Sequence, residues 1–334
     1  MRFLIVSLGS IGRRHLRNLR TLRPDARIGV LRQHTDVQKD AVPQGADEQF
    51  TTFEQAVAFA PDAAIIAGPA TSHLAVAWLL AQSGVHLLIE KPLADKPEGV
   101  DALVEYCRKH QIVLMTGYNL RFLPSLREAR RLVQFGAIGQ VFGARAEVGQ
   151  YLPDWRPDRD YRQAVSAQRA LGGGALLELS HEFDYLFWLF GHPFRVTARG
   201  GHYSPLEIDV EDMVEVILEY DSPQRLVNVH LDLIQRAPLR RCRFIGDKGT
   251  LLWDCLTDRI EYWTDGTGRW ETFDQFVCRD RNQMYLDELE HFFRCIEHGE
   301  IPLVDGVQGQ SVLAIAEAAR RSMEESISVE MIAQ

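Results

Sequence analysis

Apolar and polar residues follow two different rhythms along the chain, and the change comes near residue 120. In the first part, short apolar runs alternate with segments whose apolar residues recur every three or four positions, as in amphipathic helices. This order is typical of βαβ units and predicts a doubly wound parallel sheet. The expected strands are 3–7, 27–31, 63–67, 87–90 and 113–116, and the clearest helices are 75–83 and 100–110.

Beyond residue 120, the expected strands follow one another with short turns between them. Most show a period of two: within 213–220, Val214 and Val216 lie on one face and Glu215 lies on the other. Such alternation is typical of an antiparallel sheet that packs helices against one face only. The expected strands are 141–151, 195–203, 213–220, 226–234, 241–245 and 250–253, with helices at 176–190, 283–298 and 309–323.

The length of the chain points to two domains. At 334 residues it exceeds the size at which one hydrophobic core usually stops growing. We therefore expect an α/β protein with a doubly wound parallel domain over 1–119. An α+β domain with an open, mostly antiparallel sheet should follow over 120–334.

Charge and cysteine content narrow the class of protein. A formal net charge of -9 argues against a nucleic-acid surface, which would need a basic face. No apolar run is long enough to cross a bilayer, and the first residues lack the pattern of a signal peptide. The five cysteines are scattered and form no Cys-x-x-Cys pair, as in reduced cytosolic proteins. We expect a cytoplasmic protein without nucleic-acid or membrane partners, disulfides or a zinc site.

The first candidate site is the turn that runs from Ser7 to Gly12, between an expected strand and an expected helix. Glycines let the backbone approach a pyrophosphate, and the helix N-terminus offers free N–H groups and a positive dipole end. Ser7 stands where the first glycine of Gly-x-Gly-x-x-Gly would be, and a plain tight turn is the alternative interpretation. The turn predicts a dinucleotide site on a Rossmann domain, formed by Gly9, Ser10, Ile11 and Gly12.

Arg32 stands at the end of the second expected strand, where NAD enzymes usually carry Asp or Glu. A carboxylate there binds the ribose 2′-hydroxyl and would repel a 2′-phosphate, whereas a guanidinium can bind that phosphate through two hydrogen bonds. The sequence therefore favours NADP(H) over NAD(H). An exposed arginine without a ligand is the alternative.

Lys91 follows the expected strand 87–90 within the triplet Glu90-Lys91-Pro92. Ligands of open α/β sheets bind outside the carboxyl ends of the strands, so this lysine should point toward a cleft. It could act as a general acid or base for a hydroxyl or carbonyl group. The alternative is a structural lysine–glutamate pair at a strand end.

A glycine run at 172–174 leads into the expected helix 176–190, which carries Glu178, His181 and Asp184 in its first turns. Residues three or four apart share a helix face, so a carboxylate should lie beside the imidazole. A histidine backed by an acid can donate or accept a proton near neutral pH, and either Glu178 or Asp184 could be that acid. The alternatives are carboxylates that serve the helix dipole, or a metal site, for which no other ligand spacing exists. We expect no metal.

The loop before the glycine run combines arginines with aromatic residues. Rings can stack on sugar faces, and guanidinium groups can bind carboxylate or phosphate, so the loop would suit a polar or anionic substrate. A charged loop at a subunit contact is the alternative. The candidate substrate residues are Trp155, Arg159, Tyr161 and Arg162.

Taken in order, these segments resemble the glucose-fructose oxidoreductase / inositol dehydrogenase / MocA family over nearly the whole chain. The resemblance rests on the joint order and spacing of its motifs, none of which is specific alone. They are the turn at 8–15, Gly68-Pro69-Ala70-Thr71-Ser72-His73, Glu90-Lys91-Pro92, Asn119-Leu120-Arg121-Phe122, Gly139-Gln140-Val141 and the stretch 172–184.

The resemblance implies a Rossmann domain that binds NAD(P), followed by a domain with an open antiparallel sheet. It places Pro69, His73 and Glu90 at the cofactor and Arg121 at the substrate, with Lys91 acting beside an acid and His181. The family often reads Asp-x-Gly-x-His, whereas this chain has Glu178-Leu179-Ser180-His181, one residue shorter.

These features together predict an NAD(P)-dependent oxidoreductase that acts on CH–OH groups of a sugar or a sugar-derived, anionic substrate. One alternative is a redox-neutral enzyme that oxidises a sugar only transiently, and another is a non-catalytic dinucleotide-sensing regulator. The presence of Lys91, Glu178 and His181 argues against a pure sensor, which needs no proton-transfer groups. We also expect a homo-oligomer, a dimer or tetramer, formed through the sheet face that carries Asn228 and His230.

Overall fold

The computed structural model describes residues 1–32, 42–274 and 280–331, and these form two compact units. The first unit comprises Met1–Asn119 and Asn282–Leu313. The second comprises Leu120–Arg281 and Ala314–Gln334. The predicted division into 1–119 and 120–334 therefore misplaces the stretch Asn282–Leu313, which lies with the first unit.

The first unit is built on a six-stranded sheet in which every neighbouring pair is parallel. The strand order is β3-β2-β1-β4-β5-β6, as in doubly wound dinucleotide-binding sheets. The strands are β1 (Arg2–Val6), β2 (Arg27–Leu31), β3 (Glu48–Phe50), β4 (Ala63–Ile66), β5 (His86–Glu90) and β6 (Leu114–Gly117). The helices are α1 (Ser10–Leu22), α2 (Phe53–Ala58), α3 (Ala70–Gln82), α4 (Val100–Lys109) and α8 (Gln283–His298).

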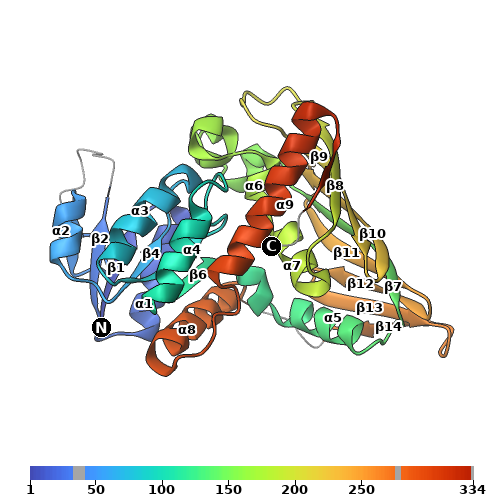
Figure 1. Cartoon of the computed structure of the whole chain (residues 1–334), viewed down its shortest axis with the longest axis horizontal. Helices are drawn as coiled ribbons and strands as arrows, with labels where there is room; N and C mark the ends of the chain where they lie inside the picture. The colour runs from blue at the N-terminus through green and yellow to red at the C-terminus, as the bar shows by residue number, and fades with distance from the viewer. Residues whose placement is uncertain (33–41, 275–279, 332–334) are drawn as a thin grey trace. The chain divides into compact units, whose positions relative to one another are not determined.

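The central strands of this sheet are apolar on both faces. All four residues of β4 are buried, and β5 is buried from Leu87 to Glu90. A parallel sheet needs helices on both faces, because its crossover helices cover each side in turn. The sequence pattern of continuous apolar runs followed by amphipathic helices thus gives the doubly wound unit seen in Figure 1.

Helix α8 completes the core of the first unit although it comes from the far end of the chain. The ring of Phe293 on α8 packs against Phe3 of β1, with centroids 5.3 Å apart. At the start of this helix, the side-chain amides of Asn282 and Asn18 exchange two hydrogen bonds of 3.1 and 2.8 Å. These contacts explain why a division by sequence order alone fails.

The second unit is built on a nine-stranded mixed sheet, in which β7 and β10 are parallel and the other neighbours are antiparallel. Its order is β14-β13-β12-β11-β7-β10-β9-β8-β15. The strands are β7 (Val141–Gly149), β8 (Arg195–Gly201), β9 (Met213–Asp221), β10 (Gln224–Asp232), β11 (Leu239–Gly246), β12 (Gly249–Asp254), β13 (Arg259–Thr264), β14 (Trp270–Phe273) and β15 (Ser328–Glu330). Its helices are α5 (Pro124–Gln134), α6 (Ala175–Glu178) and α7 (His181–Phe190), and α9 (Gly306–Glu325) runs from the first unit into the second.

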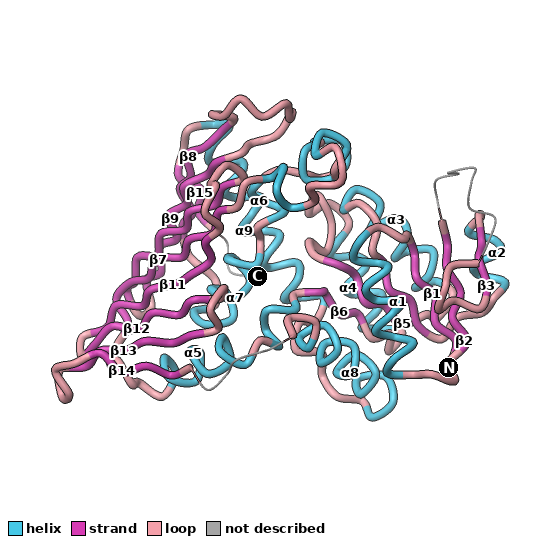
Figure 2. Tube along the Cα trace, turned by 180° about the vertical axis from the view of Figure 1, so that it is seen from behind, coloured by secondary structure: helices cyan, strands magenta, loops and turns pink. Residues whose placement is uncertain are grey.

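Only one face of this sheet is covered by helices within the described residues. Figures 1 and 2 both show α5, α6 and α7 on the same side of the strands. The alternation predicted for β9 is confirmed, since Val214 and Val216 are buried and Glu215 is exposed. The opposite face is therefore polar and open.

Two local predictions for the second unit were wrong. The helix expected over 176–190 is two helices, because α6 ends at Glu178 and α7 begins at His181. The short strands β13, β14 and β15 at the two ends of the sheet were not predicted; β13 and β14 follow β12 as antiparallel neighbours in sequence, whereas β15 pairs with the distant β8. Among the helices of the described residues, none is long and apolar enough to cross a membrane.

Candidate active site

Three of the predicted cofactor segments follow neighbouring strands of the parallel sheet. The turn before α1 follows β1, Pro69 follows β4, and Lys91 follows β5. Because β1, β4 and β5 are parallel neighbours, their carboxyl ends meet at one edge of the sheet. The strand order reverses between β1 and β4, and ligands of such sheets bind at this point.

The turn between β1 and α1 is shaped for close approach of a phosphate. A Cβ on Gly12 would lie 2.2 Å from the carbonyl oxygen of Ser7, so only glycine fits there. Ser7 itself has a φ of 78°, the conformation that glycine usually takes, so the turn keeps this shape without the first glycine of the motif. Helix α1 has no acidic residue in its first turn, and its N-terminus can therefore attract an anion. These residues fit a dinucleotide.

Arg32 follows β2 at the same edge of the sheet. Its backbone N–H donates to the carbonyl oxygen of Phe50, and its guanidinium makes a long hydrogen bond of 3.4 Å to Gln49. The side chain is half-buried. The segment 33–41 that follows lies outside the described residues.

His73, predicted to bind the cofactor, is held inside the first unit and is only 1% exposed. Its Nδ1 lies 2.9 Å from the carbonyl oxygen of Pro92, and its Nε2 lies 2.9 Å from that of Gly68. Burial lowers the pKa of this imidazole, which favours its neutral form. Both ring nitrogens thus lie against backbone carbonyls, and the neutral ring donates to one of the two. Pro69 is the cap residue at the start of α3.

Lys91 is half-buried, whereas the residues directly before and after it in the chain are buried. Glu90 before it is 9% exposed, and Leu93 and Ala94 after it are each 1% exposed. The backbone on both sides of the lysine is therefore packed into the unit. Lys91 lies at the carboxyl end of β5, as the sequence predicted.

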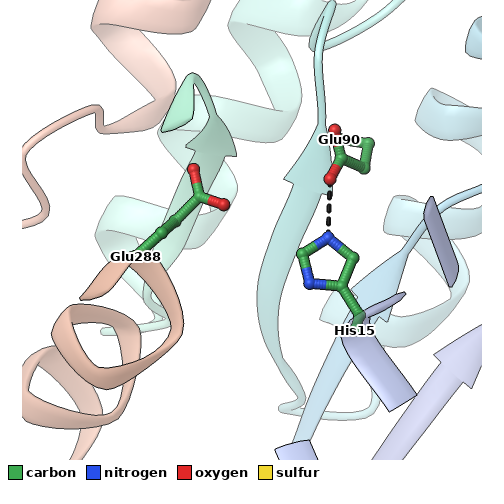
Figure 3. Close-up of side chains that lie close together, drawn as sticks. All are labelled: His15, Glu90 and Glu288. Atoms are coloured by element: carbon green, nitrogen blue, oxygen red, sulfur yellow. Dashed lines mark hydrogen bonds and ion pairs between the residues drawn. The ribbon is translucent and has the colours of Figure 1, made fainter. Parts of the chain in front are cut away.

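Three titratable side chains form a buried cluster at this strand end, and the sequence did not predict that they lie together. His15 of α1, Glu90 of β5 and Glu288 of α8 are buried, and their ligand atoms lie within 4.8 Å of one another (Figure 3). The His15 Nε2 and Glu90 Oε1 atoms are 2.6 Å apart and hydrogen-bonded. This donor set could also surround a small cation, although His15 Nε2 is already hydrogen-bonded to Glu90.

In the second unit, a buried carboxylate shapes the start of α6. Gly174 has a φ of 104°, and a Cβ on it would lie 2.4 Å from the carboxylate of Glu211. That carboxylate accepts a hydrogen bond of 3.0 Å from the N–H of Leu176. The glycine run therefore lets Glu211 reach the N-terminus of α6, a role that its position in the sequence did not reveal.

The titratable residues at 178–184 on α6 and α7 fall into two groups, one fully buried and one half-buried. Glu182 and Asp184 are fully buried, and each forms an ion pair inside the unit. Glu178 and His181 are only half-buried. Because α6 ends before Ser180 and α7 begins after it, the argument that Glu178 and His181 share one helix face does not hold.

Arg121, expected at the substrate, is also fully buried. Its Nε and Nη2 donate to both carboxylate oxygens of Asp184 over 2.7 to 3.1 Å. Burial raises the pKa of Asp184, and the charge and hydrogen bonds of Arg121 oppose that rise. The pair thus fixes α7 to the segment before α5, and Arg121 offers no exposed surface to a substrate.

The loop 152–166 encloses a cavity of about 330 Å³. Trp155, Arg159 and Tyr161 line this cavity, as expected of a substrate loop. Arg162 does not line it, and instead pairs with Asp160 and Glu207 at 2.9 and 2.7 Å. The loop is joined to the glycine run, because the N–H of Gly174 donates to the carbonyl oxygen of Ser166 over 3.1 Å.

The chain matches two models of one protein family. Residues 1–118 match "Oxidoreductase family, NAD-binding Rossmann fold", and residues 130–331 match "Oxidoreductase family, C-terminal alpha/beta domain". The chain belongs to the Gfo/Idh/MocA oxidoreductase family. It is an NAD(P)-dependent dehydrogenase that acts on CH–OH groups.

Relatives match over the whole length of the chain. Myo-inositol 2-dehydrogenase of Thermotoga maritima is 27% identical over 99% of this chain and 98% of its own. UDP-N-acetylglucosamine 3-dehydrogenase of Acidithiobacillus ferrooxidans is 26% identical over 97% of each chain. A solved structure of levoglucosan dehydrogenase with NADH has a TM-score of 0.87 at 19% identity, over 99% of this chain and 98% of that one, which shows a shared fold.

Proposed function

We propose that this dehydrogenase moves hydride between a nicotinamide dinucleotide and a hydroxyl-bearing carbon of a sugar-derived substrate in the cytoplasm. The observation that carries the proposal is Lys91, a half-buried amine in a buried run at the carboxyl end of β5. The bound nicotinamide would supply or accept the hydride at its C4 atom. The residues of the chain then have to bind the substrate and move the hydroxyl proton.

Lys91 in the first unit and His181 in the second are the proposed proton-transfer groups. A positioned acid or base of this kind typically contributes about two to four orders of magnitude in rate. Of the two acids considered as partners of His181, Glu178 is favoured, because Asp184 is bound by Arg121 and has no exposed surface. Arg121 and Asp184 then have a structural role, in which their ion pair holds α7 in place.

The cavity in loop 152–166 is the proposed site for the polar or anionic part of the substrate. The rings of Trp155 and Tyr161 can stack on a sugar face. The guanidinium of Arg159 is exposed and can bind a carboxylate or phosphate. Relatives named for inositols, levoglucosan and a UDP-sugar support a polyhydroxylated substrate class.

NADP(H) is the proposed preferred cofactor, because Arg32 stands where a ribose-binding acid would select NAD(H). The hydrogen bond of Arg32 to Gln49, at 3.4 Å, is long enough to give way to a phosphate.

A homo-oligomer is proposed through the face of the nine-stranded sheet that carries no helix. Such a face usually binds a partner, most often a second copy related by two-fold symmetry. His230 lies on this face beside Glu215, with 2.6 Å between their bonded atoms. Sedimentation of the protein at micromolar concentration measures this directly, and a species that remains monomeric would exclude it.

The function is tested with a panel of polyols, sugars, sugar acids and nucleotide sugars, each with NAD⁺ or NADP⁺. We expect reduced nicotinamide to accumulate with at least one substrate and not with a Lys91→Met variant that still binds the dinucleotide. Product formed without release of reduced nicotinamide would instead indicate a redox-neutral enzyme. Dinucleotide binding without turnover of any compound would favour a sensor.

A further inference from the structure

Two buried histidines hold the strand end that carries Lys91, one on each side of the lysine. His15 bonds to the side chain of Glu90, the residue before Lys91, over 2.6 Å (Figure 3). His73 lies 2.9 Å from the carbonyl oxygen of Pro92, the residue after it. His15 is fully buried and His73 is 1% exposed, so neither ring is placed for contact with solvent.

We propose that His15 and His73 are positioning residues, which fix the backbone on both sides of Lys91 and so hold its amine where the hydroxyl proton moves. This inference rests on the proposed role of Lys91 in proton transfer. A lysine side chain has a flexible four-carbon stem, so the position of its amine depends on how firmly its own backbone is held. Misplacement by about 1 Å can cost on the order of a hundredfold in rate.

The polarity of the two rings supports this role over simple filling of space. Burying a polar ring costs free energy unless it is hydrogen-bonded, so an apolar side chain would fill the same volume at less cost. Both histidines direct a bond to the triplet 90–92, although they come from different helices, α1 and α3. Gly117 of β6 lies against the other side of Glu90, because a Cβ there would be 3.3 Å from the Glu90 carboxyl carbon.

The same two histidines connect the lysine to the dinucleotide segments. His15 lies three residues after Gly12 on the helix that begins at the phosphate turn. The second ring nitrogen of His73 lies 2.9 Å from the carbonyl oxygen of Gly68, directly before Pro69. The arrangement therefore ties the position of Lys91 to the turns after β1 and β4.

The experiment compares His15→Leu with His15→Gln, and His73→Leu with His73→Asn. The amide nitrogen of glutamine can reach the position of the ring Nε2, which faces Glu90 in His15, and that of asparagine can reach the position of Nδ1, which faces Pro92 in His73. Both amides can donate a hydrogen bond, whereas leucine cannot. We expect the leucine variants to lose about 10- to 100-fold in kcat with a dinucleotide Kd within about threefold of wild type. The two amide variants should recover most of the lost kcat.

A double-variant series tests whether the effect passes through the lysine. In a Lys91→Met background, measured at high enzyme concentration, His15→Leu and His73→Leu should cause little further loss, because the group they position is gone. His291→Leu is the matched control: His291 is a buried histidine of the same unit, but its Nε2 accepts from the N–H of Leu303. It should lower the melting temperature without the selective loss of kcat.

Several outcomes would overturn the inference. Three results would each show a purely structural role: losses of His15→Leu and Lys91→Met that multiply, His15→Gln and His73→Asn no better than the leucine variants, or a kcat loss in His291→Leu of the same size. If His15→Leu does not fold, His15→Asn replaces it, since its shorter amide cannot reach Glu90, and equal kcat for Asn and Gln would refute the idea. Normal turnover by Lys91→Met would refute the proposed function instead.

Discussion

Arg121 and Asp184 form an ion pair in which neither side chain is exposed, and three hydrogen bonds of 2.7 to 3.1 Å join them. Removing one partner of such a pair leaves a buried charge without compensation, at a typical cost of about 3 to 5 kcal/mol. We expect Arg121→Met to lower the free energy of unfolding by this order, measured by urea denaturation. The exposed pair Arg108–Glu105 is the control, and Arg108→Met should change the free energy of unfolding far less, because solvent screens this pair. Equal effects would contradict the structure.

Gly12→Ala should remove dinucleotide binding and destabilise the first unit. The added Cβ meets the backbone oxygen of Ser7, which cannot move without opening the turn. Gly266→Ala is the matched control, because the nearest atom to a Cβ at that position is 4.0 Å away and Gly266 lies outside the turn. Titration with NADPH and NADH, followed by nicotinamide fluorescence, measures both variants. An equal loss of affinity at the two glycines would argue against this geometry.

Arg32→Asp should move cofactor preference from NADP(H) to NAD(H). The change removes the guanidinium that would bind the 2′-phosphate and introduces a carboxylate that would bind the ribose hydroxyls. The ratio of kcat/KM for the two cofactors should fall at least about tenfold, since a charged hydrogen bond is worth about 1.5 to 3 kcal/mol. A wild-type protein that binds NADH more tightly than NADPH would show that this position is misassigned.

Lys91→Met and His181→Leu should each lower kcat by about two to four orders of magnitude with little effect on dinucleotide binding. If both groups serve the transfer of one proton, the double variant should lose much less than the product of the single losses. Single-turnover rates with saturating cofactor measure this. A His181→Leu protein with normal turnover would remove this histidine from the mechanism.

Stability should fall as pH rises through the pKa of His230. The hydrogen bonds that the ring donates to the carboxylates of Asp232 and Glu215 raise that pKa to about 9, against burial, which lowers it. The imidazolium therefore contributes stability that is complete below its unfolded pKa of about 6.5 and is lost as pH rises toward 9. Melting temperatures of wild type between pH 6 and 10 should decline more than those of His230→Gln. Parallel curves would show that the histidine does not stay charged.

The sequence predicted the elements whose signals are local. The strand 27–31 and the helix 283–298 have the predicted bounds, because a continuous apolar run and a helical period each arise within one segment. The break before His181 was not predictable in this way, since the apolar period continues across it. Ser180 lies at this break, and its hydroxyl donates to the carbonyl oxygen of Leu177.

Residues of the candidate site were predictable only where they belong to a short sequence motif with a known chemical role. Gly12 and Lys91 belong to short patterns with a fixed place relative to a strand, so their positions followed from the sequence. Glu288 reaches His15 from the other end of the chain, and no local pattern predicts such a contact. Arg121 was expected at a substrate because the family resemblance placed it there, and only the packing of α7 shows it buried.

The late position of α8 in the chain has a consequence for biosynthesis. A ribosome makes Phe3 at the start of the chain and its packing partner Phe293 only after strands β7 to β14 of the nine-stranded sheet have been made. The nucleotide-binding half therefore waits for its last helix with apolar surface uncovered. An early stop codon that removes α8 would leave the N-terminal half without part of its core, and chaperones would meet it in that state.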